Sequence, residues 1–545
     1  MSASVYSPKK VSSIREMLEN AKNTAGDTVA YRYKIKRHEL KDVTYNEVYE
    51  ASMNLGAGLC SLGLGSSHIA CVAKNSYRWI VSFLTVLQGA GVFVPLDGEL
   101  PAKDLVHVLN DCDSEAVFFD RETAGFFKEH ADELPRIKYF ISLDKKVEGE
   151  RFVTFDELVD AGKNNGRDEF LALKSDPEAL KLLVYTSGTT GAAKGVMLSE
   201  HNLVSCIYYA TFRIKRMPQV GMSVLPYYHT YESVCNLLLS LNYHSTLCIN
   251  DSLLRVKENI QLFKPEYMFL VPIFAETLYS TVMRTMKKSG KLKKFEFGVK
   301  ISALLRKLGI DVRRRIFSEI IDGFGGNLRF IVCGGAAIRP ELARFYDDVG
   351  ITFIGGYGIT ECSPLVSCNA TDDTTSDTAG YVLDCLESRI DDPDEDGIGE
   401  ICVKGDVVMS GYYKKPELTK EVLIDGWFHT GDYGKFTKER RLKITGRKKY
   451  MIVLANGKNI YPEEIESYIM NIDYIDEVVV AAVKNEYGME IGLSAEIYSA
   501  NPIDSEQVRL DISEQLKELP AYKHIDKIII REKPFKKTNT RKIRR

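Results

Sequence analysis

Short apolar runs alternate with longer helical patterns through most of the chain. Apart from Lys181 and Thr352, residues 181–185, 330–333 and 351–354 are apolar. These runs include β-branched side chains and lie close to Gly-rich turns, and residues 340–348 have helical spacing. This alternation predicts an α/β fold. Parallel strands that are buried on both faces have continuous apolar sequences, and ligands of such sheets bind at the carboxyl ends of the strands. We therefore expect the functional site in the Gly-rich loops.

The stretch closest to a membrane span is residues 79–96, which carries no charge. Serine, threonine, glutamine, glycine and proline interrupt it, and a spanning helix needs about 20 predominantly apolar residues. We therefore predict a buried helix followed by a buried strand at 91–95.

The pattern changes from about residue 380, where short apolar runs are separated by Gly, Asp and Pro turns. The predicted strands are 399–403, 407–413, 427–430 and 442–445. The acidic run 391–397 lacks the spacing of a calcium-binding EF-hand loop, so it is interpreted as a hairpin turn. This part of the chain is predicted to be a β-rich subdomain.

After Gly446 the pattern changes again, to a basic run at 447–449 and a helix that starts at Pro462. A strand at 478–483 and a helix at 504–519 follow. The predicted architecture is a large N-terminal domain, residues 1–446, of layered α/β sheets with a β-rich subdomain. A small mobile α+β C-terminal domain, residues 447–545, completes it.

Composition and charge exclude several classes of protein. The 545 residues include 72 Lys and Arg and 75 Asp and Glu, a net charge of −3, which argues against bulk binding to nucleic acid. The 11 cysteines have no CxxC spacing, which favours reduced thiols over a disulfide framework or a structural zinc site. No apolar segment typical of a secretory signal follows the first lysines. We expect a cytoplasmic protein with peripheral membrane contact at most; the sequence indicates no oligomeric state.

The most informative segment is 185–195, Tyr-Thr-Ser-Gly-Thr-Thr-Gly-Ala-Ala-Lys-Gly, which follows an apolar strand. Glycines let backbone N–H groups approach an anion, the hydroxyls add donors, and Lys194 supplies a point charge. The segment is a candidate phosphate loop. It is not a Walker A motif, because no Gly-Lys-Ser/Thr triplet ends it.

The full string resembles the signature loop of the adenylate-forming superfamily, which includes acyl-CoA synthetases, luciferases and peptide-synthetase adenylation domains. That loop contacts ATP phosphates in the family. Ala193 stands where the family usually has proline, which should loosen the turn without removing Lys194. The later motifs at 429–432, 446–449 and 457–464 and the ending at 535–538 look most like those of a bacterial medium- to long-chain fatty acyl-CoA synthetase.

The resemblance continues along the chain. Residues 356–361 look like the family's YGxTE element, which implies that Tyr357 stacks on adenine, Thr360 touches the α-phosphate and Glu361 holds Mg²⁺, with Thr186 as a second magnesium ligand. Residues 334–337 look like the small-residue turn beside adenine. A flat ring suits a purine face, and a hard carboxylate suits a hard cation.

Further motifs lie toward the C-terminus. Asp432, in a segment similar to the family's HTGD element, is implied to accept hydrogen bonds from both ribose hydroxyls. Residues 446–449 resemble the GRxK hinge, with Arg447 on ribose or phosphate and Lys449 at the pivot between domains. Residues 457–466 resemble a loop on the pantetheine path, and His229 is similar to the histidine that borders the carboxylate of the acid.

The chain ends in a basic segment that looks like the family's PKTxxGKxxR element, which places Lys542 on the adenylation lysine. Arg541 replaces the usual glycine, so the local turn differs from the family pattern. The alternative for this segment is a disordered basic tail. The implied catalytic residues are Lys542, Thr186, Glu361 and His229. The resemblance implies ATP contacts for Thr186, Ser187, Gly188, Thr189, Thr190, Gly191, Lys194, Gly335, Ala336, Gly356, Tyr357, Gly358, Thr360, Asp432, Arg447, Lys449 and Lys542.

The implied activity is an acid–thiol ligase that uses ATP, Mg²⁺ and CoA. A fatty acid would first form an acyl-adenylate with release of pyrophosphate, and the thiol of CoA would then take the acyl group. An aryl-CoA ligase and an enzyme that loads an acyl carrier protein are close alternatives. A peptide-synthetase module, luciferase-type chemistry and a non-catalytic nucleotide-binding regulator are more distant ones.

Overall fold

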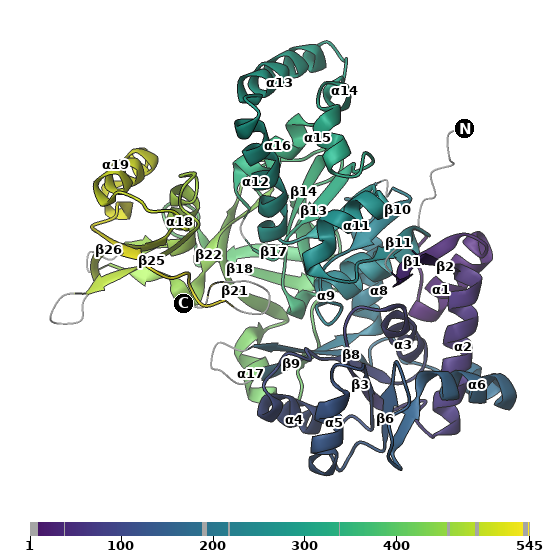
Figure 1. The fold of residues 1–545 in the computed structure, drawn as a ribbon. Helices are drawn as coiled ribbons and strands as arrows, with labels where there is room; N and C mark the ends of the chain where they lie inside the picture. The colour runs from purple at the N-terminus through teal and green to yellow at the C-terminus, as the bar shows by residue number, and fades with distance from the viewer. Residues whose placement is uncertain are drawn as a thin grey trace.

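The computed structural model describes residues 9–36, 39–187, 193–215, 218–336, 338–454, 458–484, 490–537 and 543. Two large sheets and the helices around them form the N-terminal part, and a smaller unit at the C-terminal end of the chain lies to one side of them (Figure 1). The predicted α/β class with a large and a small domain is confirmed.

The first sheet has the strand order β16-β15-β14-β13-β12-β10-β11-β1-β2 among the described residues. Its central pairs are parallel, whereas β1–β2, β14–β15 and β15–β16 are antiparallel. The strands are β1 Val29–Lys36, β2 Glu39–Thr44, β10 Val220–Ser223, β11 Thr246–Ile249, β12 Tyr267–Leu270, β13 Phe330–Cys333, β14 Thr352–Gly358, β15 Leu365–Cys368 and β16 Tyr381–Val382.

The second sheet has the order β19-β9-β8-β4-β3-β5-β6-β7. β8 pairs antiparallel with β9, and β9 with β19, while the remaining neighbours are parallel. The strands are β3 His68–Val72, β4 Val92–Pro95, β5 Ala116–Phe119, β6 Tyr139–Ser142, β7 Phe152–Thr154, β8 Leu180–Ser187, β9 Ala193–Ser199 and β19 Gly411–Tyr412.

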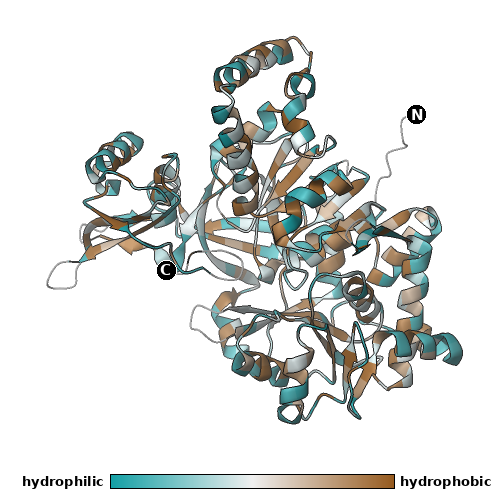
Figure 2. Ribbon diagram, viewed as in Figure 1, coloured by the Kyte–Doolittle hydropathy of each residue, from teal (hydrophilic) through white to brown (hydrophobic). Residues whose placement is uncertain are grey.

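Helices cover both faces of both sheets. One hydrophobic core lies between the sheets and includes side chains from α1, α2, α3, α8 and α10. Separate cores fill the outer faces, one under α11, α12, α15 and α16 and the other under α4 and α5. In Figure 2 the strands of the layered sheets are largely brown, whereas α19 is largely teal.

The helices have the following bounds: α1 Ile14–Ala25, α2 Tyr45–Ser61, α3 Tyr77–Gln88, α4 Ala102–Asp111, α5 Ala124–His130, α6 Phe155–Asn165, α7 Asp168–Ala172, α8 Glu200–Ala210, α9 Thr230–Glu232, α10 Leu239–Asn242, α11 Val256–Phe263, α12 Pro272–Lys288, α13 Leu292–Lys307, α14 Arg313–Ile316, α15 Ser318–Gly323, α16 Pro340–Asp348, α17 Pro416–Val422, α18 Pro462–Ile469 and α19 Ser505–Leu516. Short 3₁₀ or π segments are η1 Ala131–Glu133, η2 Ser233–Leu238, η3 Leu253–Arg255, η4 Thr360–Cys362, η5 Lys448–Tyr450 and η6 Ala521–Lys523.

The uncharged stretch 79–96 forms most of the buried helix α3 and the buried strand β4, as predicted. Trp79 is fully buried and packs against Phe83 and Phe93. No helix in the described parts of the chain combines the length and apolar character that crossing a bilayer requires.

The β-rich subdomain is a sheet of β17 Leu386–Asp391, β18 Gly399–Gly405, β21 Trp427–Phe436, β20 Leu423–Ile424 and β22 Leu442–Arg447. β17 and β18 pair antiparallel, so the acidic run between them is a hairpin turn, as predicted. The subdomain packs against the two large sheets (Figure 1).

The predicted strand 407–413 is wrong over most of its length, because only Gly411–Tyr412 forms a strand. The preceding backbone groups have partners in other elements. The Asn202 side chain donates to the carbonyls of Asp406 and Val408, and the Ser363 hydroxyl donates to that of Val407. The segment therefore satisfies its backbone without a neighbouring strand.

The C-terminal unit has its own hydrophobic core, which α18 and α19 cover. Its sheets are β23 Ile452–Val453 with β24 Asn459–Ile460, and β25 Glu477–Lys484 with β26 Glu490–Tyr498 and β27 Lys527–Arg531. The helix predicted from Pro462 and the strand predicted at 478–483 are present as α18 and β25. The predicted boundary after Gly446 falls inside β22, and it stays a prediction.

Candidate functional site

The carboxyl ends of the two large sheets meet, and hydrogen bonds join them there. Asn75, just after β3, accepts a hydrogen bond from the backbone N–H of Tyr227 at 2.9 Å and donates one to the carbonyl of Leu225 at 2.7 Å. Leu225 and Tyr227 follow β10 of the other sheet. This junction is where a ligand of parallel sheets is expected.

The candidate phosphate loop joins β8 to β9 at this junction. Thr186 lies opposite Lys194, and Ser187 opposite Ala193, in the antiparallel pair. Gly188, Thr189, Thr190 and Gly191, which are predicted to contact phosphates, lie outside the described residues. The hairpin therefore holds the hydroxyl of Thr186 and the ammonium of Lys194 on neighbouring strands at the base of the loop.

One tyrosine links this hairpin to the predicted magnesium ligand. The hydroxyl of Tyr412 donates a hydrogen bond to Glu361 Oε1 at 2.9 Å, and Lys194 Nζ lies 5.1 Å from the centre of the Tyr412 ring. Burial and the nearby Glu361 carboxylate raise the pKa of Tyr412, so the hydroxyl remains a donor at neutral pH. Tyr412 is not among the residues predicted from the sequence, since nothing local relates it to a glutamate 51 positions away.

The strand β14 brings the predicted adenine-binding element to the same edge. Its glycines allow close approach: a Cβ on Gly358 would lie 1.8 Å from the carbonyl oxygen of Pro364. A Cβ on Gly334 would lie 3.2 Å from the carbonyl oxygen of Gly356, so the 334–336 turn runs along β14. Thr360 and Glu361 follow directly, in η4.

Asp432 lies at the centre of the other half of the site. Its side chain is 3% exposed. It accepts a hydrogen bond from the Tyr357 hydroxyl at 2.6 Å and forms an ion pair with Arg447 Nε at 2.7 Å. Asp432 and Arg447 face each other on β21 and β22. Burial and the Asp432 carboxylate raise the pKa of Tyr357. The structure thus brings three predicted residues from β14, β21 and β22 into direct contact.

The predicted small-residue turn is partly exposed; Gly334 is buried, and residue 337 lies outside the described residues. Gly335 has a φ of +84°, in the left-handed region that favours glycine, and Gly335 and Ala336 are exposed. The Tyr231 hydroxyl donates to the carbonyls of Val332 at 3.0 Å and Leu270 at 3.3 Å, at the ends of β13 and β12.

His229 lies two residues before Tyr231, at the start of α9. It is half-buried, and its ring lies 4.5 Å from the ring of Tyr228. Burial and the carboxylate of Asp97 raise the pKa of Tyr228. Because Asp97 follows β4 of the second sheet, His229 lies beside the junction of the two sheets.

One predicted residue, Lys449, is not in the cluster. Lys449 is exposed in η5, with its ammonium 4.5 Å from the centre of the Tyr450 ring. Lys542 lies outside the described residues. In the basic segment, Lys537 forms an ion pair with Glu477 at 2.5 Å and an isolated antiparallel bridge with Ile543.

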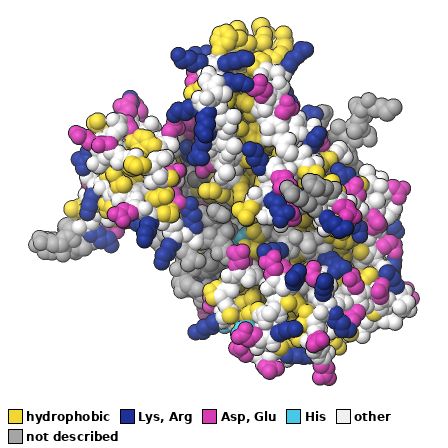
Figure 3. Space-filling view, viewed as in Figure 1, with side chains coloured by type: hydrophobic (Ala, Val, Ile, Leu, Met, Phe, Trp, Pro, Cys, Tyr) yellow, Lys and Arg dark blue, Asp and Glu magenta, His cyan; other side chains and the backbone are white. Residues whose placement is uncertain are grey.

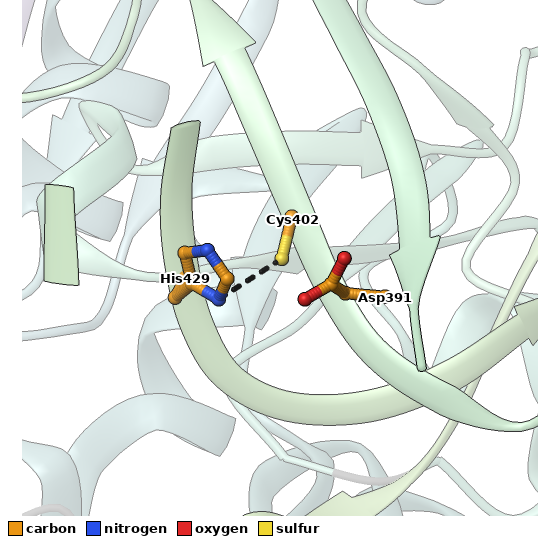
Figure 4. Close-up of side chains that lie close together, drawn as sticks. All are labelled: Asp391, Cys402 and His429. Carbon is orange, nitrogen blue, oxygen red and sulfur yellow. Dashed lines mark hydrogen bonds between the residues drawn. The ribbon is translucent and has the colours of Figure 1, made fainter. Parts of the chain in front are cut away.

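A mixed group of potential metal ligands lies next to the site, on the outer face of β17, β18 and β21. The ligand atoms of Asp391, Cys402 and His429 lie within 4.8 Å of one another (Figure 4). The guanidinium of Arg389 already interacts with two of them. Its Nη2 lies 3.3 Å from Asp391 Oδ1, and it donates a hydrogen bond to the Cys402 thiol. Burial and the Glu400 and Asp391 carboxylates raise the pKa of Cys402 to about 12, so the thiol is protonated. We therefore assign no metal ion to this group.

Comparison with known proteins agrees with these motifs. The sequence model of the AMP-binding enzyme family matches residues 18–413. The chain is 29% identical over 482 residues to long chain acyl-CoA synthetase 4 of Arabidopsis thaliana, covering 80% of this chain and 71% of the relative. It is 28% identical over 460 residues to long-chain-fatty-acid–CoA ligase FadD15 of Mycobacterium bovis, covering 81% and 75%.

Solved structures show the same fold. A crystal structure of the anthranilate CoA ligase AuaEII with anthranoyl-AMP has a TM-score of 0.79 at 18% identity, over 99% of this chain and 96% of that one. ATP-bound MatB from Rhodopseudomonas palustris has a TM-score of 0.76 at 22% identity, over 97% of each chain. The family match spans well over half of the sequence and includes the phosphate loop, the β14 element and Tyr412. The chain therefore belongs to the AMP-binding enzyme family.

Proposed function

We propose that the protein is an ATP-dependent acid–thiol ligase. It activates a medium- or long-chain fatty acid as an acyl-adenylate and transfers the acyl group to CoA, which yields acyl-CoA, AMP and pyrophosphate. The observation that carries the proposal is the link from Lys194 through Tyr412 to Glu361, because it gathers a cation and a carboxylate around one side chain at the phosphate loop. The long-chain acyl-CoA ligases among the relatives support the choice of acid.

Asp432 is proposed to bind the ribose of ATP. A carboxylate accepts several hydrogen bonds at once, and donors from Tyr357 and Arg447 fix its orientation. The ring of Tyr357 and the exposed turn at Gly335 and Ala336 are proposed to border the adenine. Arg447 then contributes positive charge beside the ribose and phosphates.

Glu361 and Thr186 are proposed to hold Mg²⁺. Carboxylate and hydroxyl oxygens are ligands that this ion prefers, and the hydroxyl of Tyr412 orients the carboxylate. When bound, the ion would neutralise negative charge on the phosphate oxygens. The residues present therefore fit the ion.

In the first step a carboxylate oxygen of the acid attacks the α-phosphorus of ATP, and pyrophosphate leaves. No nucleophilic side chain is needed, so the protein contributes alignment and positive charge. Lys194 and the phosphate loop hold the leaving phosphates, Thr360 contacts the α-phosphate, and His229 borders the carboxylate of the acid. Lys542 is proposed to stabilise the charge that develops at the α-phosphate.

In the second step the thiol of CoA attacks the acyl carbon and AMP leaves. We propose that residues 447–545 rotate about Lys449 relative to residues 1–446. This rotation would remove Lys542 from the site and bring in the path for the thiol, along 457–466. Two half-reactions then use one site. We also propose that the reaction takes place in the cytoplasm.

Lys542→Ala tests this division of labour. We expect ATP–pyrophosphate exchange to fall by about a hundredfold or more, since the variant lacks a charge at the transition state. Thioester formation from supplied acyl-adenylate should be largely retained. Lys536→Ala, an exposed lysine of the same segment, is the matched control and should leave both reactions unchanged. Equal loss of both half-reactions in Lys542→Ala would contradict the proposal.

A panel of carboxylic acids tests the substrate. Pyrophosphate release should be fastest with straight-chain fatty acids and CoA. Preference for aromatic acids would make the protein an aryl-CoA ligase. The anthranilate CoA ligase of the same fold has a name of that kind. If pyrophosphate were released only with an acyl carrier protein as acceptor, the acceptor would be that protein and not CoA.

A further inference from the structure

The helix α13 displays an apolar stripe to solvent. Phe297, Ile301, Leu304 and Leu308 recur at the spacing of one helical face, and their exposed fractions are 64%, 37%, 63% and 70%. Ile310, 51% exposed, extends the stripe. We call these five residues the α13 stripe.

The opposite face of α13 is already packed, so the stripe cannot turn inward. Phe295 lies 5.2 Å from the Phe317 ring and 5.9 Å from the Phe345 ring, measured between ring centres. A Cβ on Gly298 would lie 3.1 Å from Ile316. The helix is therefore held with its second apolar face outward, at the far end of α12 and α13 from the rest of the molecule (Figure 1).

Positive charge surrounds the stripe. Residues 287–315 contain eleven Lys and Arg but only Glu296 and Asp311 as acids, a net charge of +9 in a chain whose total is −3. In Figure 3 hydrophobic side chains gather at the top of the molecule over α13, with Lys and Arg on both sides. No carboxylate among the described residues lies within ion-pair distance of Lys293, Lys294, Lys300 or Lys307.

We infer that the α13 stripe docks on an anionic lipid bilayer. A helix with one apolar face flanked by lysines lies in the plane of a membrane interface, with its apolar side chains among the acyl chains and its ammonium groups at the headgroups. Anionic headgroups match the charge of this region. A second copy of the chain does not, because two basic surfaces repel each other, even though Glu319 and Asp347 pair with some of the cations.

The test measures co-sedimentation of the full chain with vesicles. The wild-type protein should pellet with vesicles of equimolar phosphatidylglycerol and phosphatidylcholine, less so at high salt, and much less with phosphatidylcholine alone. Leu304→Asp with Leu308→Asp should weaken binding to the anionic vesicles by about tenfold or more. The matched control is Leu510→Asp, which changes a leucine of 61% exposure on α19 and should bind as wild type.

A second variant tests the contribution of the lysines separately from that of the leucines. Lys300→Gln with Lys307→Gln should weaken binding to anionic vesicles and reduce its salt dependence, with an unchanged melting temperature. Absence of binding by the folded wild-type chain would overturn the proposal, and so would equal binding of all variants. A dimer that only the leucine variant dissociates would assign the stripe to a second copy. None of these readouts requires ligase activity, so they stand or fall separately from the proposed reaction.

Discussion

A single hydroxyl joins the acidic and basic sides of the site. Tyr412→Phe removes the donor to Glu361 and keeps the ring that lies beside Lys194. A hydrogen bond to a charged group contributes about 1.5–3 kcal/mol when buried and less when water can replace it. We therefore expect the Mg²⁺ concentration for half-maximal pyrophosphate exchange to rise about three- to tenfold.

The neighbouring tyrosine supplies the control for that prediction. Tyr413 donates its hydroxyl to Asp113, away from Glu361, at 2.8 Å. Tyr413→Phe should leave the Mg²⁺ dependence unchanged. Similar shifts in both variants would show that Tyr412 does not act through Glu361.

His244 couples stability to pH. It is buried and has a φ of +55°, and burial lowers its pKa from 6.5 to about 4. Below pH 6.5 the unfolded chain binds a proton that the folded chain does not, so stability falls as the pH drops toward 4. We therefore expect this residue to lower the free energy of unfolding by about 2 kcal/mol between pH 7 and pH 5.

His244→Asn tests this coupling, because asparagine tolerates the left-handed conformation and does not titrate. The urea midpoint of the variant should change less between pH 7 and pH 5 than that of the wild type. An identical decline in both proteins would assign the pH dependence to other groups.

The residues of the site could be predicted only where their motif is local. Thr186 and Lys194 lie in one hairpin, and Thr360 and Glu361 are adjacent, so the family's strings identify them. Tyr412 has no such string, since its role arises from the pairing of β19 with β9, which depends on the whole fold. The contact between Tyr357 and Asp432 likewise connects strands 75 residues apart.

At the scale of elements, β14 and β15 approach so closely that only glycine fits between them. Gly358→Ala would push a Cβ to 1.8 Å from a backbone carbonyl oxygen of Pro364. We expect a loss of about 3 kcal/mol or more, together with loss of pyrophosphate exchange, because backbone atoms must move. Thermal unfolding and the exchange assay would measure both effects.

Gly323 in α15 is the matched control. A Cβ there meets no atom within 4 Å. Gly323→Ala should therefore be neutral or slightly stabilising. If Gly358→Ala were equally silent, β14 and β15 would have to separate more easily than their packing indicates.

Elements with a continuous local pattern could be predicted closely. The helix α16 and the strand β13 have the predicted bounds, since their apolar spacing is uninterrupted. Residues 407–410 also have an apolar pattern, but long-range hydrogen bonds from Asn202 and Ser363 hold them as an irregular segment. Such partners leave no trace in the local sequence.

At the scale of the whole molecule, Arg339 ties the C-terminal unit to the large sheets. It donates to Glu276 at 3.1 Å and to the carbonyl of Met470, at the end of α18, at 2.9 Å. If the C-terminal unit rotates between half-reactions, this contact belongs to one arrangement only. Arg339→Ala should then change the ratio of the two half-reaction rates by about three- to tenfold.

Arg344→Ala serves as the control, because Arg344 is 63% exposed and its ion pair, 3.9 Å long, is with Glu341 of its own helix. It should leave the ratio unchanged. If Arg339→Ala lowered the rates of both half-reactions by the same factor, the variant would have lost stability in general, and the balance between the two arrangements would be unchanged.

The helix α12 connects the candidate site to the α13 stripe. It begins at Pro272, next to Val271, whose side chain faces Gly335 in the site, and its 17 residues lead to the hairpin that carries the α13 stripe. At 1.5 Å per residue it is a rod of about 25 Å. A chain docked through the stripe would meet its acid dissolved in the same leaflet. Its turnover would then follow the mole fraction of acid in the lipid and fall when inert lipid dilutes that surface, even at constant bulk concentration.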